Sequence, residues 1–234
     1  MEKKLTIVIP SKNEENYIAD LLESLSLQRI GKTQILLADA GSSDGTIKIA
    51  QKTAAEHRLN LRIISGGLPA VGRNNGARLA KTPYVLFVDS DVIFTEKCDL
   101  HLCLDEMSKG YKLLSTTPRM RSSDSLAVFL LWLNKIGTIW LSRRLPFSIG
   151  AMTLVDRESF FEKGGYDEEV KHTEDWLLSK KFEPKDFCLI PGLITQDSRR
   201  FQKFGYWKML ILILRNWKNR NNRNYFLEDA GYWS

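Results

Sequence analysis

The stretch GRNNGARLAKTPYVLFVDSD (residues 72–91) decides the fold, because it places a helical segment, a buried strand and two acids in direct succession. Tyr84–Val88 is a short apolar run of β-branched and aromatic residues, which is typical of a buried strand. Asp89 and Asp91 follow it, one residue apart. A buried carboxylate without a partner is costly, so we expect both acids to lie where the strand emerges and to face a cation, such as a metal ion.

Helical and strand-like segments alternate in the same way through the first half of the chain. We predict strands at 5–9, 34–38, 61–65 and 84–88, and helices at 15–27, 44–57 and 70–80. This alternation indicates βαβ units, and therefore an α/β fold with a mainly parallel central sheet flanked by helices. Ligands of such sheets bind at the carboxyl ends of the strands, so the loops that follow the strands are the candidate site.

The second half of the chain is less regular. We predict further strands at 111–117, 149–155 and 187–190, and a helix at 156–163 that ends at a pair of glycines. Two segments, 125–144 and 201–220, combine an apolar core with basic residues. Neither has the roughly 20 uncharged residues that a membrane-spanning helix needs. Both fit helices of the protein core or amphipathic helices at a membrane surface, and we favour peripheral membrane contact.

The composition is that of an ordinary globular protein, with 234 residues of which 43% are hydrophobic and 26% charged. The start of the chain lacks the pattern of a cleavable signal peptide. Its three cysteines, Cys98, Cys103 and Cys188, lack the paired spacing of a zinc site. Free thiols are typical of a reducing compartment, so we expect a cytoplasmic protein whose membrane contact lies at the cytoplasmic face.

The net charge of +6 is unevenly placed. Between residues 199 and 223 there are eight basic residues and no acidic one: Arg199, Arg200, Lys203, Lys208, Arg215, Lys218, Arg220 and Arg223. Such a block favours an anionic partner, which could be a phosphate group, nucleic acid or a membrane surface, although a solvated basic helix face has the same composition. A nucleic-acid-binding protein is the least favoured reading, because the rest of the chain is not basic.

Polar residues follow the second predicted strand. Asp39 ends this strand, and the sequence Gly-Ser-Ser-Asp-Gly-Thr comes after Ala40. The glycines permit a tight turn and the close approach of a ligand, and Ser43 or Asp44 can cap the next helix. Asp39 is then left to accept a hydrogen bond from a ligand. The alternative is a turn with a helix cap and no ligand.

Arg73 and Asn75 lie at the start of the next predicted helix, and the strand after it leads to Asp89 and Asp91. A helix N-terminus with a nearby arginine is an anion site. Two carboxylates at a strand tip can hold a hard divalent ion and a ribose hydroxyl. Residues suited to bind a nucleobase, a phosphate and a metal ion therefore follow one another at consecutive strand ends. This order indicates a site of the size of a nucleotide.

The segment HTEDW (residues 172–176) carries two adjacent acids before an apolar helix. They could simply cap that helix and interact favourably with its dipole. Sugar transfer with inversion, however, needs a carboxylate that takes the acceptor's proton opposite a metal-bound diphosphate, and we assign this role to Asp175. His172 is an acceptable ligand for Mn²⁺, but most single histidines bind no metal, so we leave it out of the metal site.

Five motifs in this order resemble family 2 glycosyltransferases, a family of inverting enzymes with the GT-A fold. They are TIVIPSKNEE, ADAGSSDGT, GRNNGARLAKTPYVLFVDSD, DRESFFEKGGYDE and TEDW. The resemblance implies a single GT-A domain over 1–200, with a nucleotide-binding half (1–95) and an acceptor-binding half (96–200). A basic and aromatic segment, 201–234, follows this domain as amphipathic helical structure.

The resemblance also implies which residues bind the donor. Asp39 and the loop from Pro10 to Glu14 would hold the nucleobase and ribose, and Arg73 would lie near the nucleotide. Asp89 and Asp91 would bind the ribose and Mn²⁺ or Mg²⁺ together with the diphosphate, with Asp91 the safer metal ligand. The full predicted nucleotide-sugar site comprises Pro10, Ser11, Asn13, Glu14, Asp39, Ser42, Asp44, Arg73, Asn75, Asp89, Ser90, Arg199 and Arg200.

The same resemblance implies that Asp175 is the catalytic base and that Glu174 orients the acceptor. Two features depart from the family pattern. Many members carry two acids where this chain has Asp39-Ala40, so the second contact is missing. The Gln-x-x-Arg-Trp motif of processive members is absent, and DSRRF (residues 197–201) lies in a comparable place. We therefore predict transfer of a single sugar. Arg199 or Arg200 either binds a phosphate of the donor or of the acceptor, or is plain surface charge.

The sequence thus predicts a glycosyltransferase that moves one sugar from a nucleoside diphosphate sugar, most simply a UDP-sugar, to a hydroxyl or phosphate acceptor. This acceptor could be a sugar, a lipid-linked or membrane-borne molecule, or another hydroxyl compound. A nucleotidyltransferase acting on sugar phosphates is the alternative enzyme, because it also uses a metal on paired carboxylates. Against it, the chain has no lysine-containing glycine-rich loop near its N-terminus. The TED segment would also have no role in such an enzyme.

Overall fold

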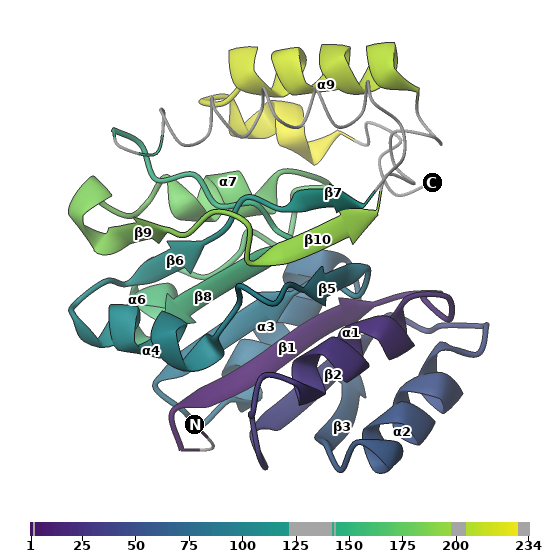
Figure 1. The fold of residues 1–234 in the computed structure, drawn as a ribbon. Helices are drawn as coiled ribbons and strands as arrows, with labels where there is room; N and C mark the ends of the chain where they lie inside the picture. Colours follow the sequence, from purple (N-terminus) through teal and green to yellow (C-terminus); the bar gives the residue numbers. More distant parts are fainter. Residues whose placement is uncertain (2, 122–141, 143, 198–204, 229–234) are drawn as a thin grey trace.

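The computed structural model describes all residues except 2, 122–141, 143, 198–204 and 229–234. Its centre is a seven-stranded sheet in the order β3-β2-β1-β4-β8-β6-β9 (Figure 1). These strands are β1 (Leu5–Ser11), β2 (Gln34–Asp39), β3 (Asn60–Ser65), β4 (Tyr84–Val88), β6 (Leu113–Ser115), β8 (Met152–Asp156) and β9 (Phe187–Leu189). Each segment that we predicted as a strand contributes one strand to this sheet.

The sheet is mainly parallel, as predicted. β1 pairs in parallel with β2 and β4, and β2 pairs in parallel with β3. β8 runs antiparallel to both of its neighbours, β4 and β6, while β9 is parallel to β6. The carboxyl ends of β1, β2, β3 and β4 therefore meet at one edge, where the predicted site lies.

A smaller sheet was not predicted. It consists of β5 (Val92–Phe94), β10 (Ile194–Asp197) and β7 (Arg119–Arg121), with β10 in the middle. β10 is antiparallel to β5 and parallel to β7. The sequences of β7 (RMR) and β10 (ITQD) are mostly polar, so they lack the apolar run that marks the equally short β6 and β9. This sheet brings the residues just after Asp91 next to β10, far along the chain.

Helices cover both faces of the large sheet. The helices α1 (Ile18–Ser26), α2 (Thr46–Glu56) and α4 (Leu100–Ser108) share one hydrophobic core, and α3 (Pro69–Leu79), α6 (Arg157–Glu162) and α7 (Glu174–Ser179) share the other. Along β1, Leu5, Ile7 and Ile9 belong to the first core and Val8 to the second. This alternation is the two-residue period of a strand that is buried on both faces.

Close packing fixes the position of α3 on the sheet. A Cβ atom on Gly76 would lie only 2.3 Å from Val8 Cγ1, so only glycine allows this approach. The helix begins at Pro69, which places Arg73 in its second turn, whereas we had placed Arg73 at the helix start. Arg73 thus projects from the interior of a helix that packs closely on β1.

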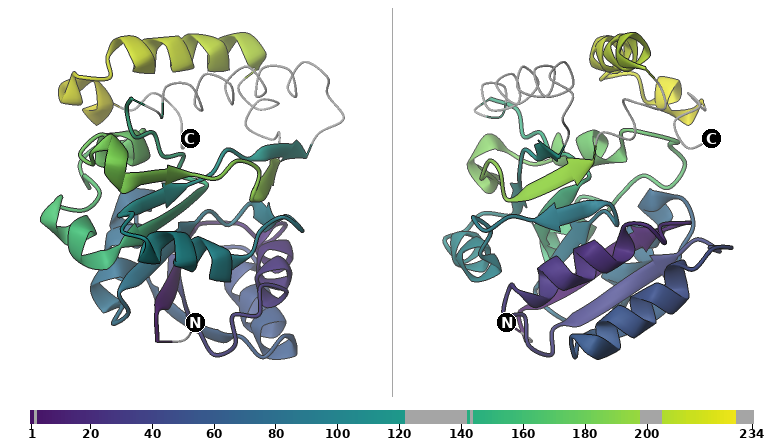
Figure 2. Two further views of the ribbon diagram at one scale, coloured as in Figure 1. Left: turned by 60° about the vertical axis from the view of Figure 1, so that its left-hand side comes forward. Right: turned by 45° about the vertical axis from the view of Figure 1, so that its right-hand side comes forward.

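The last described segments form a separate layer. Helix α9 (Tyr206–Lys218) and the 3-10 helix η2 (Arg223–Leu227), which we call the C-terminal layer, lie beyond α7 at one end of the molecule (Figures 1 and 2). Part of the predicted amphipathic segment 201–220 is therefore helical. The other such segment, 125–144, falls almost entirely outside the described residues, and the division into domain halves stays a prediction. In the part of the chain that the structure describes, no helix is both long and apolar enough to cross a bilayer.

Candidate active site

Two loops at the carboxyl ends of β1 and β2 are hydrogen-bonded to each other. The Asn13 amide donates to Ser42 Oγ at 2.9 Å, and the Ser43 amide donates to Asn13 Oδ1 at 2.9 Å. The Glu14 amide donates to Thr46 Oγ1 at 2.7 Å. Asn13 has a left-handed backbone with φ of 56°, which asparagine tolerates better than most residues. The two loops that we assigned to the nucleobase and ribose therefore form one connected structure.

The carboxylates of Asp39 and Asp44 accept hydrogen bonds within their own loop. Asp39 accepts from Ser42 Oγ at 2.5 Å and from the amides of Gly41 and Ser42 at 3.0 Å each. Asp44 accepts from the Thr46 amide at 3.0 Å, in the first turn of α2. The N-cap residue of α2 is Gly45 and not the predicted Ser43 or Asp44, so the turn and the contact of Asp44 with Thr46 explain part of this motif. Since a carboxylate has about four lone-pair sites, Asp39 keeps capacity for a ligand.

Arg73 of α3 links the end of β4 to the start of α7. Its Nη2 donates to Asp89 Oδ1 at 2.6 Å, and its Nη1 donates to Glu174 Oε1 at 2.6 Å. The Arg73 side chain is only 2% exposed, and those of Asp89 and Glu174 are 15% and 10% exposed. Both ion pairs are therefore largely removed from water, and the removal of either partner would leave a buried charge uncompensated.

Arg73 stays charged in this buried position. Burial by itself lowers the pKa of Arg73, but the carboxylates of Asp89 and Glu174 hold that pKa above its usual value. The guanidinium carbon also lies 5.3 Å from the ring centre of Tyr166, within range of a cation–π interaction. A single cation thus joins acids from two of the predicted motifs.

Asp175 is held by two backbone amides beside these ion pairs. The Gly150 amide donates to Asp175 Oδ2 at 2.6 Å, and the Trp176 amide donates to Oδ1 at 2.8 Å. Burial and the negative charge of Glu174 raise the pKa of Asp175 to about 6. A carboxylate with such a pKa takes up a proton more readily than an ordinary aspartate and is still mostly ionised at neutral pH. Asp175 is therefore suited to act as a general base.

Asp91 and Ser90 lie between β4 and β5 and are 3% and 4% exposed. Within the described ranges, no group of three or more His, Cys, Asp or Glu side chains is arranged to hold a metal ion. Asp89 and Asp91 do offer hard carboxylate oxygens, of which one accepts from Arg73. This donor set fits a hard divalent ion that takes one or two carboxylates from the protein and the rest of its ligands from substrate phosphates and water.

The other predicted site residues occupy different positions. Pro10 and Ser11 are the last residues of β1, and the buried Ser11 hydroxyl has no hydrogen-bond partner among the described residues. Asn75 is turned toward β3, where its Nδ2 donates to the Ser65 carbonyl at 3.1 Å. Arg199 and Arg200 fall outside the described residues. Their assignment to the donor site stays a prediction.

Sequence reasoning did not identify Gly150 or Asn74. The Gly150 carbonyl accepts from Arg73 Nη2 at 3.4 Å, and a Cβ atom here would lie 3.4 Å from Asp175 Oδ2. A glycine inside the predicted strand 149–155 marks such a close approach and is the signal that was available. Asn74 is buried, and its Nδ2 donates to the Tyr166 carbonyl at 2.9 Å. Nothing local in the sequence indicates that partner.

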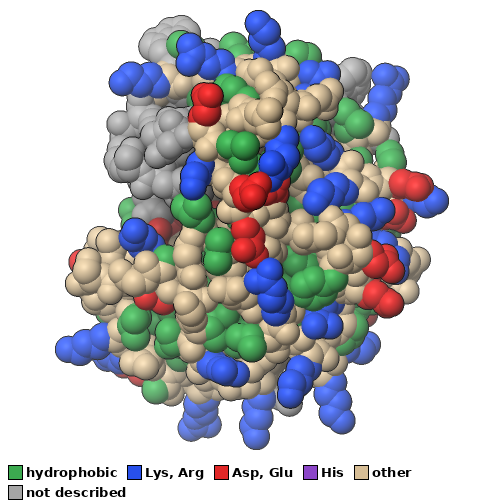
Figure 3. All heavy atoms as spheres, turned by 180° about the vertical axis from the view of Figure 1, so that it is seen from behind, with side chains coloured by type: hydrophobic (Ala, Val, Ile, Leu, Met, Phe, Trp, Pro, Cys, Tyr) green, Lys and Arg blue, Asp and Glu red, His purple; other side chains and the backbone are tan. Residues whose placement is uncertain are grey.

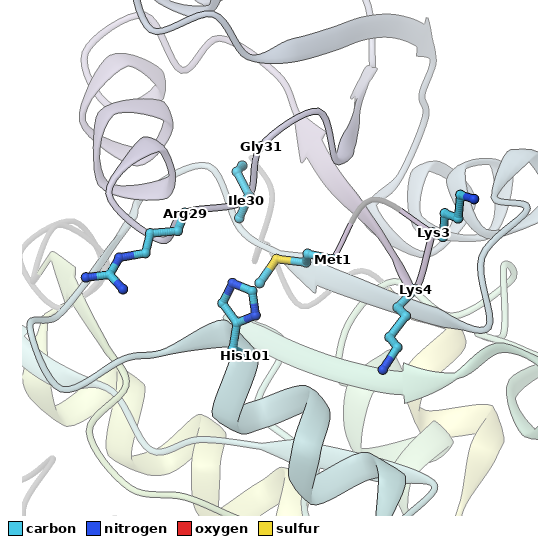
Figure 4. A pocket seen from close by; sticks show the side chains of 7 residues that line it. All are labelled: Met1, Lys3, Lys4, Arg29, Ile30, Gly31 and His101. Carbon is cyan, nitrogen blue, oxygen red and sulfur yellow. The ribbon is translucent and has the colours of Figure 1, made fainter.

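A hollow of about 360 Å³ lies at the opposite edge of the sheet, near the amino ends of β1 and β2 (Figure 4). Its lining includes Met1, Lys4 and His101 and contains no carboxylate. Figure 4 shows the side chains of Lys3 and Arg29 extended in opposite directions, so they do not converge on one ligand. Among the described residues, the candidate acids therefore lie at the carboxyl ends of the strands and not around this hollow.

Comparison with known proteins gives one family. A family model described as Glycosyl transferase family 2 matches residues 6–162. The chain is 36% identical over 194 residues to poly(ribitol-phosphate) beta-N-acetylglucosaminyltransferase TarS of Staphylococcus aureus, covering 76% of the chain and 32% of TarS. It is 30% identical over 185 residues to a 4,4'-diaponeurosporenoate glycosyltransferase of the same species, covering 73% and 48%. The chain thus spans about a third of the length of the first relative and about half of the second.

Solved structures agree with this match. TarS in complex with UDP-GlcNAc has a TM-score of 0.64 at 21% identity, covering 83% of the chain and 58% of that structure. Glucosyl-3-phosphoglycerate synthase of Mycobacterium tuberculosis, with Mn²⁺, UDP-glucose and phosphoglyceric acid, has a TM-score of 0.62 at 16% identity, covering 98% and 82%. These likenesses confirm the α/β fold of the GT-A type that the motifs predicted.

The contribution of the buried ion pairs of Arg73 can be tested by measuring the free energy of unfolding. We expect Arg73→Met to lower the free energy of unfolding by about 3–5 kcal/mol, because two largely buried carboxylates lose their cation. The matched control is Arg78→Met on the same helix, whose side chain is 55% exposed in its ion pair with Glu168. Its loss should cost about 0–1 kcal/mol. Urea unfolding of both variants gives the comparison, and equal losses would contradict the structural role of Arg73.

Proposed function

Because the chain belongs to glycosyltransferase family 2, we propose that it transfers a single sugar from a nucleoside diphosphate sugar to a hydroxyl or phosphate acceptor, with inversion at the anomeric carbon. A UDP-sugar is the proposed donor. Its support is that TarS was solved with UDP-GlcNAc and the mycobacterial synthase with UDP-glucose. The observation that carries the proposal is the network in which Arg73 joins Asp89 to Glu174 beside Asp175.

In this proposal, Asp175 acts on the acceptor. Its carboxylate takes the proton of the acceptor hydroxyl, whose oxygen forms a bond to the anomeric carbon. The bond between that carbon and the diphosphate breaks, and the nucleoside diphosphate leaves with the electron pair. The amides of Gly150 and Trp176 keep the carboxylate of Asp175 in a fixed orientation. Such preorganisation avoids reorientation at the moment of reaction.

Asp91 and Asp89 would hold Mn²⁺ or Mg²⁺ at the diphosphate. The mycobacterial structure contains both Mn²⁺ and UDP-glucose, which supports a divalent ion for this fold. When bound, such an ion supplies positive charge to the leaving diphosphate. The role of Arg73 is then indirect, since it orients Asp89 and keeps the charge of the acidic site balanced.

Calorimetry tests the donor and metal site. We expect the protein to bind UDP at least about tenfold more tightly with Mn²⁺ than without it, a difference of about 1.4 kcal/mol. Asp91→Asn should lose this metal-dependent gain, because it removes a charged oxygen ligand. Asp105→Asn, at an exposed position of α4, is the control. The same measurement with GDP and CDP identifies the nucleobase of the donor. Equal Mn²⁺-dependent binding by the wild type and Asp91→Asn would refute the metal assignment.

Initial rates as a function of pH test the base. The turnover number should rise through a midpoint near pH 6 and level off above it, because only ionised Asp175 accepts a proton and its pKa is raised to about 6. Asp175→Asn should bind UDP normally and lose at least about 100-fold in turnover. A midpoint near the ordinary aspartate pKa, or near-normal turnover by Asp175→Asn, would refute the assignment of Asp175 as the general base.

A membrane-borne acceptor at the cytoplasmic face is the further part of the proposal, and α9 supports it. Ile211, Leu214 and Trp217 are exposed and, being three residues apart, share one face of the helix. Exposed Arg215 and Lys218 lie beside them. Figure 3 shows several Lys and Arg side chains and a few hydrophobic ones at the end of the molecule where α9 lies, and further Lys and Arg side chains at the opposite end. Rings and aliphatic side chains flanked by cations are suited to an anionic lipid surface.

Vesicle flotation tests this surface. We expect binding to vesicles of phosphatidylglycerol and phosphatidylcholine at low salt. The triple variant Ile211→Ser, Leu214→Ser and Trp217→Ser should reduce partitioning at least about tenfold, because apolar area is lost from the contact. Leu102→Ser, which changes an exposed leucine on α4, is the control. Absence of binding by the wild type would point to an acceptor in solution, and equal binding by the triple variant would refute this surface of α9.

A further inference from the structure

Helix α7, which carries the candidate catalytic acids, is short and begins in a strained conformation. It has six residues, Glu174–Ser179, and Thr173 before it has a φ of 66°. A β-branched residue rarely adopts this left-handed conformation. The Thr173 side chain makes no capping hydrogen bond to the helix. The orientation of Glu174 and Asp175 therefore depends on contacts from other segments.

The C-terminal layer supplies such contacts directly before the acids. Asn216 of α9 donates from Nδ2 to Thr173 Oγ1 at 3.2 Å. The Lys171 amide donates to the carbonyl of Phe226 in η2 at 2.8 Å. Both the side chain and the backbone of the segment that enters α7 are thus bonded to the C-terminal layer.

Arg223 holds the same segment further upstream. Its Nε donates to Asp167 Oδ2 at 2.5 Å, and its Nη2 donates to Asp167 Oδ1 at 2.9 Å. Nη2 also donates to Glu169. This fork-to-fork geometry is more directional than a contact between point charges, so it fixes the orientation of the segment as well as its distance from η2.

An apolar cluster closes the space between these polar contacts. Phe226 is fully buried against Val170, Trp176 and Leu177. The ring of His172 lies 5.3 Å from that of Phe226, centre to centre, at an interplanar angle of 65°. Residues on both sides of Glu174 and Asp175 therefore pack on η2.

We propose that Asn216 and Arg223 are positioning residues for the Glu174–Asp175 pair, an inference that rests on the proposed transferase function. The segment 167–176 lies between two sets of contacts. On its inner side, Arg73 binds Glu174 and the Gly150 amide binds Asp175. On its outer side, the C-terminal layer binds Thr173 and Asp167. Loss of the outer set releases the strained backbone at Thr173 and moves Asp175 away from Gly150.

Kinetics of two variants test the inference. Asn216→Ala and Arg223→Gln are compared with Asn221→Ala, between α9 and η2, and Arg62→Gln, on β3, both of which change exposed side chains. The reaction is hydrolysis of UDP-GlcNAc with Mn²⁺. The water oxygen bonds to the anomeric carbon, its proton passes to Asp175, and UDP leaves. We expect kcat to fall by about tenfold to 100-fold in the first pair, with UDP affinity unchanged. Arg223→Lys, which keeps the cation without its fork, should lie between.

Hydrogen exchange gives a second measurement that does not depend on activity. In both variants, exchange should increase in peptides covering residues 172–178 and stay unchanged in β1 and β4. Unchanged kcat together with unchanged exchange would overturn the inference. A uniform rise in exchange across the sheet would also overturn it, because it would mean a general loss of stability. If the wild type neither hydrolyses UDP-GlcNAc nor binds UDP with Mn²⁺ while residues 172–178 respond as expected, the proposed function fails and the positioning of this segment stands.

Discussion

The site depends on one buried cation. Arg73 lies between Asp89 and Glu174, which come from distant parts of the chain, and each of the three charges would be costly without the others. The position of this cation is fixed by packing, because Gly76 allows α3 to approach Val8 of β1 more closely than any other residue would. A backbone contact in the core thus determines where two acidic motifs meet. The Gly150 carbonyl, at 3.4 Å from Arg73 Nη2, extends the same network to the turn before β8.

This arrangement also separates the acids by environment. Asp89 and Glu174 are paired with Arg73, whereas Asp175 accepts hydrogen bonds from backbone amides. Burial and its neighbour Glu174 raise the pKa of Asp175 to about 6. Two adjacent acids in the sequence therefore have different properties, because one faces the arginine and the other faces the Gly150 turn. Division of roles between neighbouring carboxylates is a common way to obtain a base beside a charged anchor.

The sequence predicted those features that depend on short-range patterns. Buried strands of five or more residues, such as Tyr84–Val88, are marked by their composition, and the acids at their ends follow from the order of strands in a parallel sheet. Long-range partners were not predictable in this way. Nothing near Arg73 indicates that its partners are Asp89 and Glu174, and nothing near Val92–Phe94 indicates that β5 pairs with β10, about 100 residues later. Helix α4 was also missed, although Asp99 caps it by accepting from the His101 amide. A cap alone is too common a pattern to define a helix.

Helix α9 has one face that contacts the inside of the protein and another face that is exposed. Asn216 lies on the part of the helix that bonds to Thr173, directly before the catalytic acids. Trp217, one residue later and 59% exposed, belongs to the apolar face that has no cover among the described residues. Adjacent residues on a helix point about 100° apart, so one rigid element can contact a surface outside the protein and a strained turn inside it. Under the two proposals above, the element that meets the lipid surface is also the element that holds the acids in place. A change in the position of α9 would then reach Asp175 through Thr173 and the rest of the segment 167–176, and not through the donor-binding loops of β1 and β2.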